Sequence, residues 1–249
     1  VRSRRQRQMC IRDRVNIMMN RKKKIVIIGG GLAGLALAMK FCERNGEVTV
    51  VSYQSLKRSH SVCAQGGINA AIDAKNEGDS PEKHFYDTIK GGDFLAHQPL
   101  VRDMCYQAPA IIHLMDRMGV AFNRTGEGHL DFRRFGGTLY NRTAFAGATT
   151  GQQLVYALDE QVRRNIHDGN ATALEWHEYL GAVLDSDGIC RGAVIHDLKT
   201  DEIYTLPADA VVLATGGPGQ VYGRSTNSVV NTGAAATTCL LYTSPSPRD

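Results

Sequence analysis

The 249-residue sequence lacks the cysteine and histidine patterns that point to a metal site or a disulfide scaffold. Its six cysteines are scattered along the chain, at positions 10, 42, 63, 105, 190 and 239. No two of them form a CxxC motif, and the eight histidines show no ligand spacing. Disulfide scaffolds and zinc sites both need clustered ligands. We therefore predict no metal and no disulfide framework, in a reducing compartment.

The sequence also lacks an apolar run that would span a bilayer comfortably. The best candidate, residues 21–39, is interrupted by three consecutive glycines, and a spanning helix needs about 20 predominantly apolar residues. No internal repeat and no low-complexity segment is present either. The apolar content of 43% is enough for a sizeable core.

Beyond its first 24 residues, the chain lacks an excess of positive charge. Residues 1–24 contain ten Lys/Arg and one Asp, a balance of +9, so the net charge of +4 leaves −5 for the remainder. Nucleic-acid binding domains normally show a basic footprint. We therefore predict no nucleic-acid partner.

Both ends of the sequence differ in character from the rest. Residues 1–14 have no periodicity, and the last ten residues interrupt a run of small residues, 232–239, that predicts a helix. Both strings resemble translated sequencing adapters. We interpret residues 1–17 and 240–249 as non-native tails around one partial domain, 18–239, with a native start at Met18 or Met19.

The first regular unit predicts a strand, a helix and a second strand. Lys24–Gly30 is a continuous apolar run, Leu32–Arg44 is apolar nearly all round, and Glu47–Tyr53 is again strand-like. Such a βαβ unit implies a parallel sheet, so the expected class is α/β.

Further elements are predicted from start signals and periodicity. The expected helices follow Ser80-Pro81, cover Pro99–Met118 with an interruption near Pro109, and run from a capping box at Thr150 and Gln153 to about Ile166. The expected strands form a β-meander, Tyr179–Leu184, Ile189–Asp197 and Glu202–Leu206, followed by a buried strand, Ala210–Ala214.

The turn between the first strand and helix matches G-x-G-x-x-G. Glycines at its first two positions allow a tight turn and a close approach of backbone to a pyrophosphate, and the third lets helix pack on strand. The positive end of the helix dipole favours the phosphate charge. The residues of this nucleotide-binding turn are Gly29, Gly30, Gly31, Leu32, Ala33 and Gly34.

Two features favour FAD over NAD. The second strand ends at Val51-Ser52-Tyr53, without the acid that usually binds the ribose in NAD enzymes, although Ser52 could bond a ribose. The meander, the return strand and the ATGG string at Ala214–Gly217 fit a Rossmann-like fold of the two-dinucleotide-binding type. The polar segment Ser59–Gly67 could then run along an extended cofactor.

Local chemistry does not decide the roles of several loop residues. The glycines of Ala64–Ala71 suit either a flat ring or an ordinary loop. Arg133 and Arg134 suit an anion site or, more commonly, a solvated basic pair. A lone histidine such as His60 is more often structural than chemical.

Longer strings resemble one family, the flavoprotein subunit of succinate dehydrogenase/fumarate reductase, with the strongest likeness to its Bacillus-type branch. They include GGGLAGL, KRSHSVCAQGGINAA, LDFRRFGGT and ATGGPG, within a resemblance that covers about Lys24 to Thr238. The chain is expected to be an N-terminal fragment of such a subunit, truncated before its capping domain.

The resemblance implies specific contacts. It places FAD covalently on His60 through the flavin 8α-methyl group and assigns no catalytic residue to this chain, because the family's acid–base arginine and most dicarboxylate ligands would follow Asp249. The implied FAD contacts are the glycine turn, Val51, Ser52, Tyr53, Ser59, His60, Ser61, Gln65, Gly66, Gly67, Tyr179, Ala214, Thr215 and Gly216, with Phe135 at the substrate.

The implied activity is interconversion of succinate and fumarate, with electrons passing through an iron–sulfur subunit and a membrane cytochrome b anchor to or from quinone. The subunit would sit peripherally at the cytoplasmic face of the cell membrane, and the fragment alone would be inactive. Three alternatives stay open: an L-aspartate oxidase-like flavoprotein, whose loop lacks the histidine, an NAD-dependent dehydrogenase, and a non-catalytic nucleotide-binding module.

Overall fold

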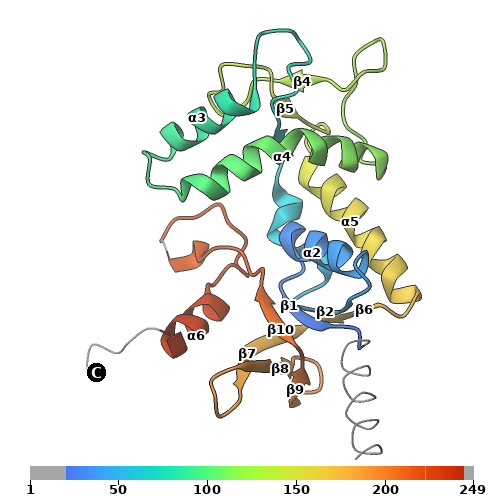
Figure 1. Ribbon diagram of the computed structural model, residues 1–249, viewed down its shortest axis with the longest axis vertical. Coiled ribbons are helices and arrows are strands. Elements are labelled where there is room, and N and C mark those ends of the chain that lie inside the picture. Colours follow the sequence, from blue (N-terminus) through green and yellow to red (C-terminus); the bar gives the residue numbers. More distant parts are fainter. Residues whose placement is uncertain (1–20, 222, 244–249) are drawn as a thin grey trace, which may run out of the picture.

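The computed structural model describes residues 21–221 and 223–243, and a four-stranded parallel sheet forms its centre (Figure 1). The strand order is β10-β1-β2-β6. Because Ile28 lies opposite both Val51 and Leu213, the carboxyl ends of three strands meet at one edge. The α/β prediction is confirmed. The strands are β1 (Lys24–Ile28), β2 (Glu47–Ser52), β6 (Ala171–Glu175) and β10 (Ala210–Leu213).

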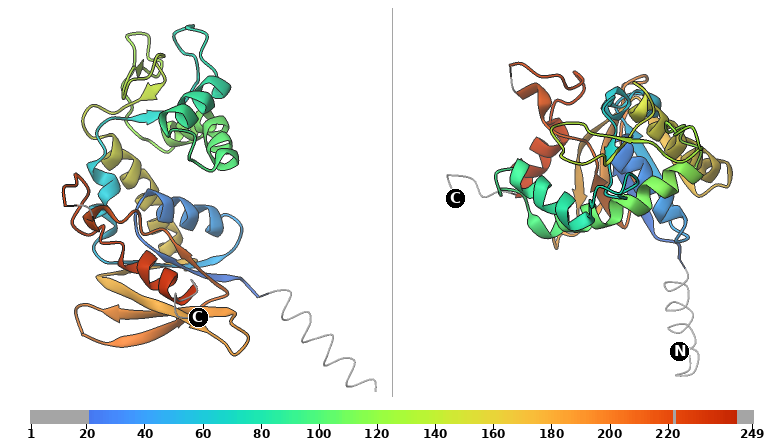
Figure 2. Two further views of the ribbon diagram at one scale, coloured as in Figure 1. Left: turned by 90° about the vertical axis from the view of Figure 1, so that its left-hand side faces the viewer. Right: turned by 90° about the horizontal axis from the view of Figure 1, so that it is seen from above.

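Both faces of this sheet are covered. Alternate side chains of β1 point to opposite sides, so Ile25 and Ile27 join the buried cluster of α2 and α5, while Val26 and Ile28 join the buried cluster of the meander. Figure 2 shows the meander on one side of the sheet and α2 on the other. These layers are α2 (Leu32–Cys42), α5 (Thr150–His167) and the antiparallel strands β7 (His177–Leu184), β8 (Cys190–Asp197) and β9 (Ile203–Pro207).

A second lobe stands beyond α2 and α5 in Figure 1. It consists of two helices and a short antiparallel sheet of order β3-β5-β4. Its elements are α3 (Pro81–Gly91), α4 (Gln98–Arg117), β3 (Ile68–Asn69), β4 (Phe132–Arg133) and β5 (Thr143–Ala144). As predicted, Ser80 caps α3, because its hydroxyl accepts a hydrogen bond from the Lys83 amide at 3.2 Å.

The predicted interruption of α4 near Pro109 is wrong. The helix is continuous from Gln98 to Arg117 with Pro109 inside it. Cys105, Ala108 and Ile112 lie on one face and are buried. This packing outweighs the local penalty of an interior proline, which is about 3 kcal/mol.

The capping box predicted for α5 is also wrong, although the helix starts where expected. Thr149 is the N-cap residue and makes no side-chain cap. Thr150 is buried instead, and its hydroxyl accepts a hydrogen bond from the Ala146 amide at 3.0 Å. The buried Thr150 hydroxyl therefore binds the preceding loop and does not cap the N-terminus of α5.

Three further features complete the fold. Strand β6 was not predicted, although it pairs in parallel with β2 along its whole length. Helix α6 (Ala234–Thr243) extends into the segment interpreted as a non-native tail, whereas the tail at residues 1–17 lies outside the described residues. Within the described part of the chain, no helix is both long enough and apolar enough to cross a membrane.

Candidate functional site

The glycine turn between β1 and α2 is fixed by backbone contacts that no larger residue permits. Gly29 has φ = +115°, and a Cβ atom there would lie 2.3 Å from the carbonyl oxygen of Ala214. A Cβ atom at Gly34 would lie 1.9 Å from the carbonyl oxygen of Gly29. The absence of a side chain at Gly29 thus allows the end of β10 to approach the turn. The absence of one at Gly34 allows α2 to pack against the turn, as predicted.

Helix α2 begins with unpaired donors. Gly31 is its N-cap residue, and it has no side chain to cap the helix. The Leu32 amide donates to Ser61 Oγ at 3.2 Å. The amides of Ala33 and Gly34 have no hydrogen-bond partner among the described residues, as expected for the first turn of a helix. Two N–H groups at the positive end of a helix dipole are therefore free for an anion.

A buried hydroxyl lies next to these donors. Ser59 Oγ is inaccessible to solvent and has no partner in the described chain. A Cβ atom at Gly31 would lie about 4.0 Å from Ser59 Oγ and 3.1 Å from Ser61 Oγ. A buried hydroxyl without a partner is unfavourable. A phosphate oxygen would satisfy both it and the helix amides, so the residues present fit the pyrophosphate of a dinucleotide.

The neighbouring strand ends lie beside the glycine turn. The Ala214 amide donates to the Ile28 carbonyl at 2.7 Å, which brings Ala214, Thr215 and Gly216 beside the glycine turn. Ser52, at the end of β2, is buried, and its hydroxyl would lie 3.1 Å from a Cβ atom at Gly30. Ligands of parallel α/β sheets bind at such an edge.

An acid does stand at this edge, although β2 lacks one. Glu175 ends β6 directly opposite Ser52. Its Oε1 accepts hydrogen bonds from Ser55 Oγ at 3.1 Å and from the Leu56 amide at 3.0 Å. Glu175 therefore holds the segment that follows β2. Sequence reasoning missed it because β6 itself was not predicted.

His60 is held from two sides. It opens the short helix η2 (His60–Cys63), which follows η1 (Leu56–Arg58). On one side, Ser61 binds the start of α2, and the Ala64 carbonyl accepts a hydrogen bond from the Gly151 amide at 2.7 Å. On the other side, the Ser228 amide donates to His60 Nδ1 at 3.1 Å. His60 thus lies in a segment that is bound to the starts of α2 and α5, and its ring contacts the loop that follows β10.

Arg133 organises the segment of Gln65, Gly66 and Gly67. Its guanidinium donates to the Gly66 carbonyl at 2.7 Å and lies 4.3 Å from the Phe145 ring centre. Its neighbour Arg134 is largely exposed and pairs with Glu77 at 3.1 Å. The Nε of Arg133 is buried without a partner among the described residues, so an anion site at Arg133 stays a prediction.

Phe135 and Tyr179 lie in different surroundings. The Phe135 ring covers Gly66, where a Cβ atom would approach it to 2.4 Å, yet 52% of the residue remains exposed. Tyr179 is buried between the parallel sheet and the meander, with its phenol oxygen 3.5 Å from Cys239 Sγ. Only the backbone of Tyr179 is therefore available to line a crevice. Tyr53 is exposed.

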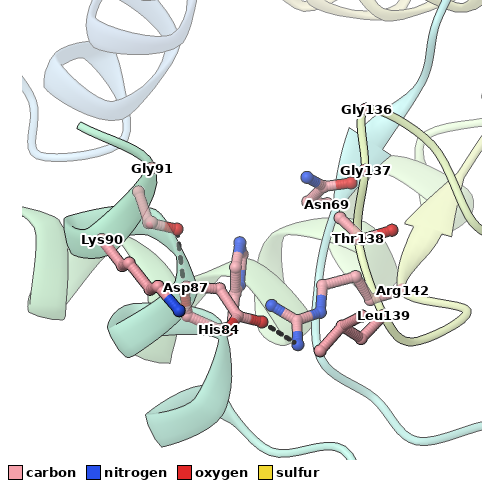
Figure 3. Close-up of a pocket in the computed structure, with 11 residues that line it drawn as sticks. Asn69, His84, Asp87, Lys90, Gly91, Gly136, Gly137, Thr138, Leu139 and Arg142 are labelled. Atoms are coloured by element: carbon pink, nitrogen blue, oxygen red, sulfur yellow. Dashed lines mark hydrogen bonds and ion pairs between the residues drawn. The ribbon is translucent and has the colours of Figure 1, made fainter. Parts of the chain in front are cut away.

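The cavity of about 550 Å³ in Figure 3 lies in the second lobe, not at the glycine turn. Asp87 of α3 faces Arg142 across it, and their ion pair measures 2.9 Å. His84 also lines it, and burial, followed by the charge of Arg142, lowers the pKa of its imidazole. Because the arginine is already paired with acids, we take the glycine turn, and not this cavity, as the candidate dinucleotide site.

Comparison with known proteins agrees with this geometry. Residues 24–240 match the family model described as FAD binding domain. The chain belongs to this family. FAD is thus the dinucleotide that the turn accommodates, which sets aside the NAD-dependent interpretation.

The similar proteins point to one branch of the family. The chain is 60% identical to the succinate dehydrogenase flavoprotein subunit of Bacillus subtilis, over 86% of this chain and 37% of that protein. It is 35% identical to the fumarate reductase flavoprotein subunit of Helicobacter pylori, over 86% and 33%. The resemblance is confirmed, and the chain spans less than two fifths of these relatives.

Solved structures give the same result. The Mycobacterium smegmatis Sdh1 complex superposes with a TM-score of 0.83 at 32% identity, covering 88% of this chain and 39% of that one. An Escherichia coli quinol fumarate reductase superposes with a TM-score of 0.80 at 32% identity, covering 89% and 37%. The fold is therefore that of the FAD-binding region of such flavoproteins.

Proposed function

We propose that the chain is the FAD-binding part of a flavoprotein subunit that interconverts succinate and fumarate. The observation that carries this proposal is the position of His60, beside the glycine turn and the unpartnered Ser59 hydroxyl, in a chain 60% identical to a succinate dehydrogenase flavoprotein subunit. Bound FAD supplies the two-electron chemistry, exchanging a hydride with the C4 dicarboxylate. The chain's own residues bind and orient that cofactor.

The cradle suggests how each part of the cofactor is held. The pyrophosphate would take the amides of Ala33 and Gly34 and the hydroxyl of Ser59. Ser52, between Val51 and Tyr53, would bond the adenosine ribose. Other contacts follow from position: the backbone at Tyr179 for adenine, Gln65, Gly66 and Gly67 for the flavin ring, and Ala214, Thr215 and Gly216 to close the crevice.

His60 would carry the flavin covalently at its 8α carbon. Since Nδ1 accepts the Ser228 amide, Nε2 is the nitrogen left to form the bond. Bond formation would remove one hydrogen from Nε2 and one from the flavin methyl group. Dioxygen, or another two-electron acceptor, would take these two hydrogens with their electrons, and dioxygen would become hydrogen peroxide.

The covalent bond serves the dicarboxylate chemistry. Removing hydrogen from an alkane bond needs a strong acceptor, and an 8α linkage would raise the potential of the flavin and prevent its loss. Phe135 would pack against the substrate, because its exposed ring lies over Gly66 on the flavin side of the cradle.

The proposed partners extend the same function. An iron–sulfur subunit would receive or supply the electrons, and a membrane cytochrome b anchor would exchange them with quinone. The subunit would lie peripherally at the cytoplasmic face of the membrane. These proposals are supported by relatives whose names include quinol-fumarate reductase and an Sdh1 complex with UQ1.

Acid denaturation of the holoprotein tests the proposal. We expect flavin to remain with the precipitated protein, and His60→Ser to bind FAD that acid releases. His113→Ser is the matched control, because His113 is exposed on α4. Flavin that acid extracts from the unmutated holoprotein would refute the covalent link and revive an L-aspartate oxidase-like function. Succinate must also bleach the flavin spectrum of the complete subunit.

A further inference from the structure

The hydrogen bond between Ser228 and His60 joins segments that are distant in sequence. The donor is the backbone N–H of Ser228, in the 218–231 loop (residues 218–221 and 223–231), and the acceptor is His60 Nδ1, at 3.1 Å. Figures 1 and 2 both place this loop, coloured red-orange, beside the segment that contains η2. Both residues are half-buried.

The 218–231 loop holds this N–H in place through its own hydrogen bonds. The Asn231 amide donates to the Ser228 carbonyl at 3.0 Å, and the Gln220 amide donates to the Asn231 carbonyl at 3.1 Å. Gly219 is buried against Asn227, where a Cβ atom would lie 2.2 Å from Asn227 Nδ2. The donor is therefore positioned before any ligand binds.

A neutral imidazole has one donor and one acceptor nitrogen, so a fixed N–H donor selects its tautomer. With Nδ1 as acceptor, the proton resides on Nε2. Attachment of a carbon at Nε2 removes that proton and leaves Nδ1 unchanged as an acceptor. The same hydrogen bond thus persists before and after the reaction, and the ring need not turn.

Attachment at Nδ1 would have the opposite consequence. An alkylated Nδ1 has no lone pair in the ring plane, so the Ser228 N–H would lose its acceptor in a half-buried position. The geometry therefore disfavours one of the two possible isomers.

We propose that the Ser228 backbone N–H is a positioning group for flavin attachment: it fixes the plane and tautomer of His60 and directs the bond to Nε2. This inference rests on the proposed covalent function. In the reaction, the N–C bond forms, Nε2 and the flavin methyl group each lose one hydrogen, and dioxygen or an equivalent acceptor takes both with two electrons.

The first test measures the histidine itself. In the flavin-free chain labelled with ¹⁵N-histidine, two-bond proton–nitrogen correlation spectra report the tautomer, and His60→Asn assigns the signal. We expect a proton on Nε2 and an acceptor shift at Nδ1. A proton on Nδ1, or averaging of the two tautomers, would overturn the proposal without bearing on whether FAD becomes attached.

The second test removes the donor in the holoprotein. Ser228→Pro lacks the N–H, whereas Ser228→Ala keeps it. Val229→Pro is the matched proline control, because the Val229 amide has no partner among the described residues. We expect Ser228→Pro alone to slow attachment about tenfold, as loss of one hydrogen bond predicts, or to yield the Nδ1 isomer on analysis of the flavin peptide.

The outcomes distinguish the role of Ser228 from covalent attachment itself. Wild-type rate and pure Nε2 isomer in Ser228→Pro would overturn the role of Ser228 while leaving the covalent function intact. Absence of covalent flavin in the unmutated holoprotein would refute the covalent link on which this inference rests. Should Ser228→Pro fail to fold, the tautomer measurement on the unmutated chain decides the proposal.

Discussion

Arg142 and Asp79 form a bidentate ion pair that is almost completely buried, with side-chain exposures of 1% and 3%. The two contacts measure 2.7 Å and 3.0 Å, and Asp87 adds a third at 2.9 Å. The Arg142 carbonyl also accepts a hydrogen bond from the Ala70 amide at 2.7 Å. Arg142 therefore links Asp79 and, through Asp87, helix α3 of the second lobe to the segment that follows Gly67.

Arg142→Met should destabilise the chain strongly. The substitution retains much of the volume but leaves the Asp79 carboxylate buried without its partner, a change that costs on the order of 3–5 kcal/mol. Urea unfolding measures it. Lys40→Met is the control, because it breaks the exposed pair with Glu43 and should change stability by less than about 1 kcal/mol. Equal, small effects of the two substitutions would contradict this assignment.

Gly34→Ala should disturb both folding and FAD binding. Its Cβ atom would lie 1.9 Å from the Gly29 carbonyl oxygen, so α2 must move away from the turn. Overpacking of this kind costs roughly 1–3 kcal/mol, and the shift displaces the helix amides from the pyrophosphate. Unfolding and FAD titration measure the two effects. Gly126→Ala is the control, since nothing lies within 4 Å of its Cβ position. An FAD affinity unchanged by Gly34→Ala would show that the turn does not hold the cofactor.

The parts of the site that the sequence predicts are those encoded locally. The glycine turn follows a strand and precedes a helix within a few residues, so its pattern alone predicts its geometry. The role of Glu175 depends on its pairing opposite Ser52. The contact between Ser228 and His60 spans 168 positions. No local pattern encodes such pairings, because the sheet edge that brings them together forms only when the whole domain packs.

The same reasoning explains the errors in the predicted helices. Proline and threonine signals near Pro109 and Thr150 describe the isolated chain, where hydrogen bonds to the backbone dominate. In the folded protein both helices are buried along one face, and burial decides their course. The contact of Arg133 was not predicted for a related reason: its acceptor, the Gly66 carbonyl, is brought to it by sheet β3-β5-β4.

Arg133→Lys should loosen the segment of Gln65 and Gly66. A lysine keeps the charge but cannot lie flat on the Phe145 ring and bond the Gly66 carbonyl together. We expect faster amide hydrogen exchange at residues 64–68 and slower flavin attachment in the holoprotein. Arg134→Lys is the matched control, because Arg134 binds only the exposed side of the loop through Glu77. Exchange rates that respond equally to both substitutions would rule out a specific role for Arg133.

His84 should make the stability of the chain depend on pH near neutrality. The residue is 5% exposed, and its Nδ1 has no partner among the described residues. Desolvation, followed by the charge of Arg142, lowers the pKa of the folded-state imidazole from its ordinary 6.5, against smaller opposite effects of Asp79 and Asp87. As the pH falls below about 6.5, His84 becomes protonated in the unfolded chain but stays neutral in the folded chain. The free energy of unfolding therefore decreases with falling pH, until the folded-state pKa is reached.

His84→Gln removes this proton and should flatten the dependence between pH 7.5 and about 5.5. Urea midpoints at intervals across this window measure it, with His113→Gln as the control at an exposed imidazole. Carboxylates do not obscure the window. The pKa values of Glu77, Asp185 and Asp209 are lowered, chiefly by hydrogen bonds from backbone amides, so their contributions are lost only at more acidic pH. If the stability of His84→Gln still depends on pH across this window, another group is responsible, and the buried imidazole does not contribute to the pH dependence.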